Sequence, residues 1–131
     1  SLTGLTEVRL DGGTGTDAVA LVGTTAADTF RVTDAGIVFG SLLVTPVDAE
    51  SVTVDGGAGT DTLVGGDAGS AWRVTGANAG TLDSLAFRNV ENLTGGAGDD
   101  TFALAGGTLT GKIDGGLGAD MFVADNGANA W

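Results

Sequence analysis

Short runs of alternating apolar and polar residues, separated by glycine-rich loops, extend along the whole chain. In segments 18–22 and 29–33, for example, Val19 and Leu21, and then Phe30 and Val32, fall on one side. Alternation with a period of two is typical of a half-buried β-strand, and no glycine-free stretch has the apolar period of an α-helix. The pattern predicts an all-β chain, with further strands over 6–10, 37–39, 42–45, 51–54, 62–64, 71–75, 81–87 and 89–93.

The glycine loops set the expected architecture. Gly95–Asp100 recurs as Gly115–Asp120, and similar loops begin at Gly12 and Gly56, so the successive starts are 44, 39 and 20 residues apart. A period of about 20 residues is typical of solenoids, and parallel crossovers are right-handed. We therefore expect a right-handed parallel β-solenoid (β-roll or β-helix) of about six coils of about 20 residues each. One edge would stack the four loops with turns near Asp34 and Gly76, and the other edge would stack turns near Gly23, Pro46, Gly65, Arg88, Gly106 and Asp125.

A large apolar residue follows each loop at a fixed distance. Two positions after the last loop residue the chain has Val19, Phe30, Leu63, Trp72, Phe102 or Phe122. We expect these side chains to form one thin core, and hence a single domain over residues 1–131. Solenoids need capped ends, and no polar cap is visible at either terminus. The sequence thus suggests a segment of a longer chain, packed on neighbouring coils, or a filament subunit that associates end to end.

Composition excludes several functional classes. The chain has 17 acidic and 5 basic residues, a net charge of −12, no Cys and no His. Such acidity argues against nucleic acid and anionic membrane surfaces as partners, although it also serves solubility and protection of sheet edges. No apolar run is long enough to span a membrane. Acid–base catalysis needs positioned partners, and with no His and no Tyr we do not expect an enzyme.

The loops carry the motif G-G-x-G-x-D-x-U-x, in which U is a large apolar residue. Gly12–Ala20, Gly56–Val64, Gly95–Ala103 and Gly115–Val123 all match it. They resemble the calcium-binding repeats of RTX proteins, which form parallel β-rolls. The resemblance implies that Ca²⁺ lies between loops one coil apart, held by loop carbonyls and Asp carboxylates, the oxygen ligands that this ion prefers. Unlike RTX blocks, these loops are not uninterrupted nonapeptides, and Ser70 replaces the final Asp of one unit.

The spacing ranks the candidate metal ligands. Asp100 and Asp120 end two complete loops one coil apart, with Asp99 nearby, so they form the best candidate calcium site. Asp61 and Asp17 face degenerate loops and would need help from Asp34, Asn78 or water. The alternative is that each Asp accepts hydrogen bonds from the backbone of its own turn or from a stacked Thr, without metal.

Three functional hypotheses remain open. The first is a structural segment, such as a stalk, adhesin segment or filament subunit, of a secreted or surface-exposed bacterial protein. The repetitive, glycine-rich sequence resembles the repeat regions of large bacterial adhesins. The second is a calcium-responsive RTX-type folding module of a secreted exoprotein. The third is a polysaccharide-binding or polysaccharide-cleaving β-helix, for which the paired carboxylates Asp99 and Asp100 are the motivating feature.

Overall fold

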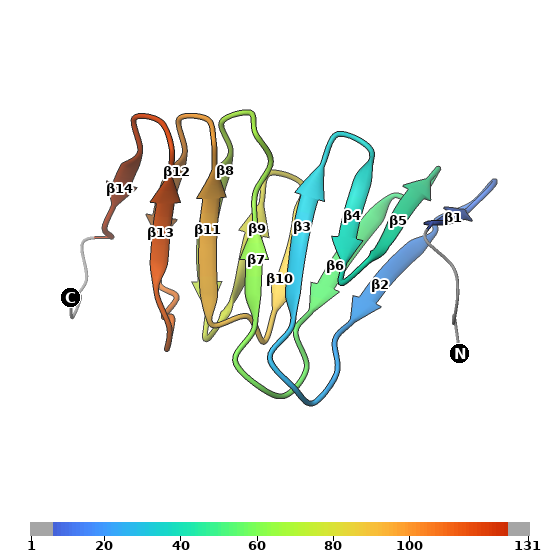
Figure 1. Ribbon diagram of the computed structural model, residues 1–131, viewed down its shortest axis with the longest axis horizontal. Helices are drawn as coiled ribbons and strands as arrows, with labels where there is room; N and C mark the ends of the chain where they lie inside the picture. Colours follow the sequence, from blue (N-terminus) through green and yellow to red (C-terminus); the bar gives the residue numbers. More distant parts are fainter. Residues whose placement is uncertain (1–6, 126–131) are drawn as a thin grey trace.

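The computed structural model describes residues 7–125, which form fourteen short strands in two sheets of seven (Figure 1). Thr6, which begins the predicted strand 6–10, and Trp131 lie outside this range. The first sheet has the order β1 (Glu7–Asp11), β5 (Leu42–Val47), β4 (Gly36–Phe39), β3 (Thr29–Thr33), β7 (Thr62–Val64), β11 (Asn92–Gly96) and β13 (Ile113–Gly116). The second sheet has the order β14 (Met121–Val123), β12 (Thr101–Leu104), β8 (Ala71–Gly76), β9 (Ala79–Leu82), β10 (Leu85–Arg88), β6 (Ser51–Asp55) and β2 (Ala18–Val22).

The prediction of a regular, right-handed parallel β-solenoid of six coils is wrong. The two sheets are mixed and do not close into a solenoid, because β4 and β9 each pair antiparallel with both neighbours. Two-residue turns, such as Asp83-Ser84 between β9 and β10, return the chain within one sheet. Asp83 has a φ of 51°, a left-handed conformation that Asp and Asn tolerate in tight turns. The remaining pairs are parallel, so two three-stranded antiparallel meanders, β3–β4–β5 and β8–β9–β10, interrupt an otherwise parallel arrangement.

These meanders also change which loops lie together. The strands β3, β4 and β5 all stay in the first sheet, and β8, β9 and β10 all stay in the second. Between β1 and β6 the chain therefore crosses between sheets three times, so the Gly12 loop leads from the first sheet to the second and the Gly56 loop leads back. Within each sheet, the strands that are joined to the other sheet all run in the same direction. The loops that leave the first sheet therefore lie at one edge, and the loops that return to it lie at the opposite edge. The prediction that one edge carries all four full loops is wrong.

We call the edge at which the chain passes from the first sheet to the second the forward edge, and the opposite one the return edge. The forward edge carries loops 12–17, 65–70, 95–100 and 115–120 and the corner 48–50. The return edge carries loops 23–28 and 56–61, the corner 89–91 and the segment 105–112. In Figure 1 the loops joining β11 to β12 and β13 to β14 lie at the top, and those joining β2 to β3 and β6 to β7 lie at the bottom.

One apolar core fills the space between the two sheets. The predicted core residues Phe30, Leu63, Trp72 and Phe102 are all buried, whereas Phe122, in the last strand, is 41% exposed. The rings of Trp72 and Phe102 stack with centroids 5.4 Å apart, in the range of favourable aromatic pairs. The other buried apolar residues come from both sheets and from the corner 89–91: Leu21, Ile37, Val44, Val54, Val74, Leu82, Phe87, Val90 and Leu93.

Candidate functional site

Glycines shape each acidic loop for two separate reasons, which the loop 56–61 illustrates. Gly57 and Gly59 have φ values of 91° and 132°, in a region that L side chains rarely adopt. Gly56 is needed for space, because a Cβ atom there would lie 2.7 Å from Oδ2 of Asp61. The loop's own carboxylate therefore folds back over its first glycine, and the same packing recurs between Gly95 and Asp100 and between Gly115 and Asp120.

The carboxylates on the forward edge connect neighbouring loops. The backbone N–H of Ser70 donates to Oδ1 of Asp100 at 2.8 Å, and the N–H of Asp100 donates to Oδ1 of Asp120 at 3.0 Å. The carbonyl groups of the same residues accept in return, Ser70 from the N–H of Thr101 and Asp100 from the N–H of Met121. The last residue of each loop thus makes two hydrogen bonds to the next loop and the strand that follows it: its backbone N–H donates and its carbonyl group accepts.

The return edge repeats this arrangement with different residues. The N–H of Asp28 donates to Oδ1 of Asp61 at 2.8 Å, and the N–H of Asp61 donates to Oε2 of Glu91 at 2.8 Å. At the β1 end of the forward edge, the N–H of Asp17 donates to Oε2 of Glu50 at 2.6 Å. We use the word layer for a loop or corner together with the strands that flank it. In all five cases the backbone N–H of the last loop residue donates to a carboxylate of a layer that comes later in the sequence. We call this repeated contact the carboxylate clamp.

Burial sets the electrostatics of the clamp. Asp61 and Asp100 are 0% and 1% exposed, and their Oδ2 atoms, with Oδ2 of Asp17, have no hydrogen-bond partner among the described residues. Burial raises the pKa of Asp61, and the negative charges of Glu91, Asp28 and Asp55 raise it further. Burial also raises the pKa of Asp100, with a smaller contribution from Asp120. Asp61 and Asp100 are therefore held in surroundings that disfavour their charge.

Two groups lie close to the buried carboxyl of Asp100. A Cβ atom at Gly95 would contact Oδ2 of Asp100, so the carboxylate packs directly against the glycine backbone. The indole N–H of Trp72 has no partner within normal hydrogen-bond geometry, yet it lies near enough to the Asp100 carboxyl to lower the pKa of that group. Trp72 therefore offsets part of the cost of burying the charge.

A second polar cluster supports the return edge. Oδ2 of Asp55 accepts from Nε of Arg88 at 2.7 Å, and its Oδ1 accepts from Nδ2 of Asn89 at 2.8 Å. The Asn89 hydrogen bond is the main cause that lowers the pKa of Asp55, and Arg88 lowers it further. Asp55 is therefore stabilised as a carboxylate, in contrast to Asp61 and Asp100.

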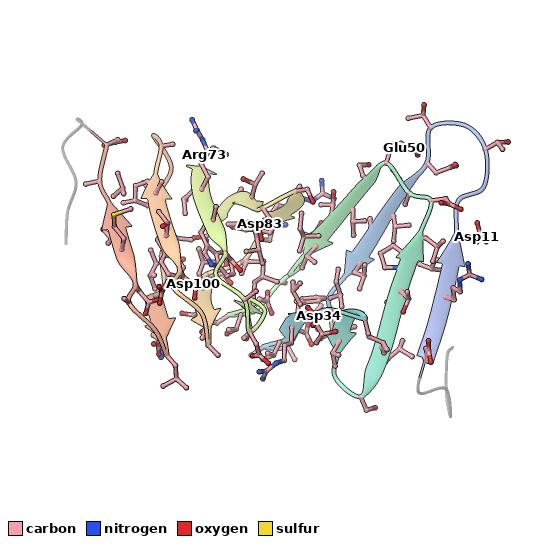
Figure 2. The ribbon with its side chains drawn as sticks, turned by 90° about the horizontal axis from the view of Figure 1, so that it is seen from above. Asp11, Asp34, Glu50, Arg73, Asp83 and Asp100 are labelled. Atoms are coloured by element: carbon pink, nitrogen blue, oxygen red, sulfur yellow. The ribbon has the colours of Figure 1, made fainter. Side chains whose placement is uncertain are left out.

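The structure brings together some of the sequence-predicted ligands and separates others. Asp100 and Asp120 are in adjacent layers, and the exposed Asp99 accepts from the N–H of Ala119 at 2.8 Å. Asp61 lies on the return edge and Asp17 at the β1 end, so neither joins the Asp100–Asp120 pair. Figure 2 shows Glu50 at the β1 end, near Asp11, and Asp100 farther along the molecule.

Sequence reasoning missed Glu50 and Glu91, the partners of Asp17 and Asp61. A signal was available in the segments Asp48-Ala49-Glu50 and Asn89-Val90-Glu91, which are 41 residues apart. Their first residues share a left-handed φ, 53° for Asp48 and 52° for Asn89. The common pattern marks two equivalent corners, each of which places a glutamate against a loop from the preceding layer.

The arrangement provides an incomplete donor set for calcium. Ca²⁺ takes six to eight oxygen ligands, but no three acidic side chains within residues 7–125 are placed to hold one ion together. Oδ1 of Asp100 and of Asp120 already accept backbone N–H groups, and Oδ2 of Asp100 packs against Gly95. Calcium at Asp99, Asp100, Asp120, Asp61 or Asp17 therefore stays a prediction, whereas the hydrogen bonds that Asp99, Asp100, Asp120 and Asp61 accept from the backbone join the layers without metal.

Comparisons of the chain with protein-family models, curated proteins and solved structures found no match. Within the described range, no helix is long and apolar enough to cross a membrane. The function must therefore be argued from the clamp and the sheets themselves.

Proposed function

We propose that the chain is a structural segment, a stalk, adhesin segment or filament subunit, of a secreted or surface-exposed bacterial protein. The single observation that carries this proposal is the carboxylate clamp. Asp17, Asp28, Asp61, Ser70 and Asp100 each use the backbone N–H to hold the following layer. Each acidic partner turns one carboxylate oxygen toward a backbone N–H group, as expected for groups that set the spacing between layers.

The shape of the molecule also favours a spacer. The strands β1 and β2 lie at one end of the long axis and β13 and β14 at the other (Figure 1). The apolar core runs through the layers between them. Close-packed interiors resist compression, so such a chain holds its two ends at a fixed separation.

Single-molecule fluorescence energy transfer tests this rigidity. The chain has no cysteine, so Val22→Cys and Leu117→Cys, at exposed positions near opposite ends, can be labelled selectively. A rigid spacer gives one narrow distance distribution at picomolar concentration. A broad distribution, or several interconverting distances under native conditions, would contradict the proposal.

The calcium-responsive folding module is a second candidate function. It is favoured by the unpartnered Oδ2 atoms of Asp61 and Asp100, because neutralising a buried carboxylate stabilises the state that buries it. Under this alternative the acidic loops repel one another until a cation binds. The structural proposal instead expects the clamp to form in the absence of metal.

Circular dichroism and thermal unfolding in EDTA, in Mg²⁺ and in Ca²⁺ separate the two candidates. A calcium module unfolds in EDTA and gains thermal stability only in Ca²⁺, by linkage to binding. Asp120→Asn should abolish that gain, and Asp67→Asn, at a surface carboxylate 82% exposed, should not. Identical β-sheet spectra and melting curves in all three buffers would eliminate the calcium-responsive candidate.

A further inference from the structure

The two ends of the molecule expose different groups of the carboxylate clamp. The β13–β14 end has the backbone donor, and the β1–β2 end has the carboxylate acceptor. The N–H of Asp100 donates to Asp120, but no residue in the described part of the chain accepts from the N–H of Asp120. At the other end, Oδ1 of Asp61 and of Asp100 accept from the preceding layer, whereas neither oxygen of Asp17 accepts a hydrogen bond within residues 7–125. One end thus offers a donor and the other offers the matching acceptor.

The loops that carry these groups are equivalent. Gly12–Asp17 reads GGTGTD and Gly115–Asp120 reads GGLGAD, and both belong to the forward edge. Each follows a terminal strand of the first sheet, β1 or β13, and precedes a terminal strand of the second, β2 or β14. In the first sheet the two antiparallel pairings of β4 cancel and every other pairing is parallel, so β1 and β13 run in the same direction.

The contact between loops 95–100 and 115–120 gives the register for one copy on another. In that contact Phe102 pairs with Phe122, and Thr101 pairs with Met121. Placing loop 12–17 of a second copy on loop 115–120 sets Phe122 against Val19, and Met121 against Ala18. The joint would bury Phe122, which is 41% exposed, and would continue the core from one copy into the next, whereas Met121 and Val123 lie on the outer face of β14, like Thr101 and Ala103 of β12.

From this complementarity we propose that a second copy of the chain docks head to tail, with β13 beside its β1, β14 beside its β2, and the N–H of Asp120 bonded to its Asp17. The contact is heterologous and leaves one free end of each kind, so it generates an open filament. This inference rests on the proposed structural function and names the partner of its ends. The other occupant of these ends, a further repeat of a longer chain, would leave isolated copies monomeric.

Charge governs the conditions under which copies associate. Each copy carries a net charge of −12, and the joint would bring the acidic residues Asp114 and Asp120 near Asp11 and Asp17 of the second copy. Salt screens such repulsion, since the Debye length falls from about 10 Å at 0.1 M to about 3 Å at 1 M. Association should therefore strengthen as NaCl is raised, in contrast to an interface held by ion pairs.

A complementation experiment tests the direction of the contact. Val19→Arg places a charge at the β1–β2 end, and Phe122→Arg places one at the β13–β14 end. Sedimentation velocity at high micromolar concentration and raised salt should show open-ended oligomers for the unmodified chain and monomers for each variant alone. An equimolar mixture should form a dimer and nothing larger, because only one intact pair of ends remains. A monomeric unmodified chain, a variant that dimerises alone, or a mixture that stays monomeric would overturn the proposal.

Cysteine cross-linking tests the register at exposed positions, where substitution does not disturb the core. Met121→Cys in one copy should form a disulfide rapidly with Ala18→Cys in another, because paired strands place Cα atoms within disulfide reach. Val22→Cys, four residues farther along β2, is the matched control and should react at least tenfold more slowly. Equal rates for the two partners, or no cross-linking, would contradict the register. The dilute fluorescence measurement on single copies reports rigidity alone, so loss of the filament and loss of the spacer function are distinguishable.

Discussion

Oδ1 of Asp120 accepts the backbone N–H of Asp100 at 3.0 Å, while Oδ1 of Asp100 accepts the N–H of Ser70 at 2.8 Å. The same residue therefore serves as donor toward one layer and as acceptor toward the other. A polar chain of this kind makes each layer depend on its neighbours for hydrogen bonding as well as for burial of its apolar side. Four predictions follow from the clamp, its glycines and its charges.

Truncation of the clamp should destabilise the protein in proportion to burial. Asp100→Ala leaves the buried N–H of Ser70 without an acceptor, which costs about 1–3 kcal/mol of unfolding free energy. Asp99→Ala is the control, because Asp99 is exposed and water can replace its contact with Ala119. Urea unfolding measures both, and equal losses for the two variants would show that the buried clamp carries no special stability.

Adjacent glycines should respond oppositely to alanine. A Cβ at Gly65 would contact the carbonyl of Gly95 and lie 3.0 Å from the Trp72 ring, whereas one at Gly66 would meet nothing closer than 3.8 Å. Gly65→Ala should cost several kcal/mol through strain in a packed region. Gly66→Ala should be neutral or stabilise by about 0.4–1 kcal/mol, because alanine restricts the unfolded chain. Thermal unfolding of the pair decides, and a Gly65→Ala variant as stable as Gly66→Ala would contradict the contact.

The pH dependence of stability should reflect the raised pKa values of Asp61 and Asp100. For a carboxyl whose folded pKa lies above the unfolded 3.8, the folded state binds protons more tightly. Stability contributed by these groups therefore rises as pH falls through the folded pKa, and it levels off below 3.8. Asp55 has the opposite sign: its pKa is lowered, so its contribution is lost as pH falls below 3.8.

The measurement is urea unfolding between pH 7 and pH 4.5, a window above the ordinary Asp pKa. The unmodified chain should become more stable toward pH 4.5, and Asp61→Asn should flatten this slope. Asp67→Asn, which removes an exposed charge, serves as the control and should leave the slope nearly unchanged. A steady loss of stability over the same range would show that other groups dominate.

At the return edge, Asn89→Ala should lower the free energy of unfolding more than Arg88→Ala does. Arg88 is 59% exposed, so Arg88→Ala should cost only about 0.2–1 kcal/mol and less at high salt. Asn89→Ala removes a hydrogen bond to the partly buried Asp55 and places alanine at a φ of 52°, a left-handed conformation that costs about 1–2 kcal/mol by itself. Chemical denaturation in low and high salt tests the ranking, which would be reversed if the ion pair dominated.

Local patterns in the sequence predicted the elements better than their connections. The strands 18–22, 29–33 and 62–64 were predicted with their observed bounds, because apolar alternation and flanking glycines define them locally. The segment 81–87 was interpreted as one strand, although Asp83-Ser84 divides it between β9 and β10. Whether a short turn returns the chain within a sheet or carries it to the opposite sheet depends on which strands pair afterwards, and alternation along one segment contains no such information.

The candidate site shows the same limit. The glycine motif locates the loops, and their 20-residue spacing predicts that loops 95–100 and 115–120 are neighbours, but not that the N–H of Asp100 donates to Asp120. The assignment of Asp17 and Asp61 to other partners could not follow from the loops, because the meander β3–β4–β5 places those loops at opposite edges. Glu50 and Glu91 contact them across 33 and 30 residues of sequence, and such contacts depend on the pairing of whole strands.

The two meanders have a consequence for how such a chain tolerates insertions and deletions. Each has two strands more than a single crossing strand would provide, and because one meander lies in each sheet, both sheets reach seven strands and end level. Reducing a single meander to one strand would leave one sheet shorter by two strand spacings, about 9–10 Å, and would offset β1 from β2. Reducing both would shorten the molecule evenly, with the terminal loops unchanged. The length of the protein can therefore change by matched pairs of strands, one pair from each sheet, during evolution or in a designed variant.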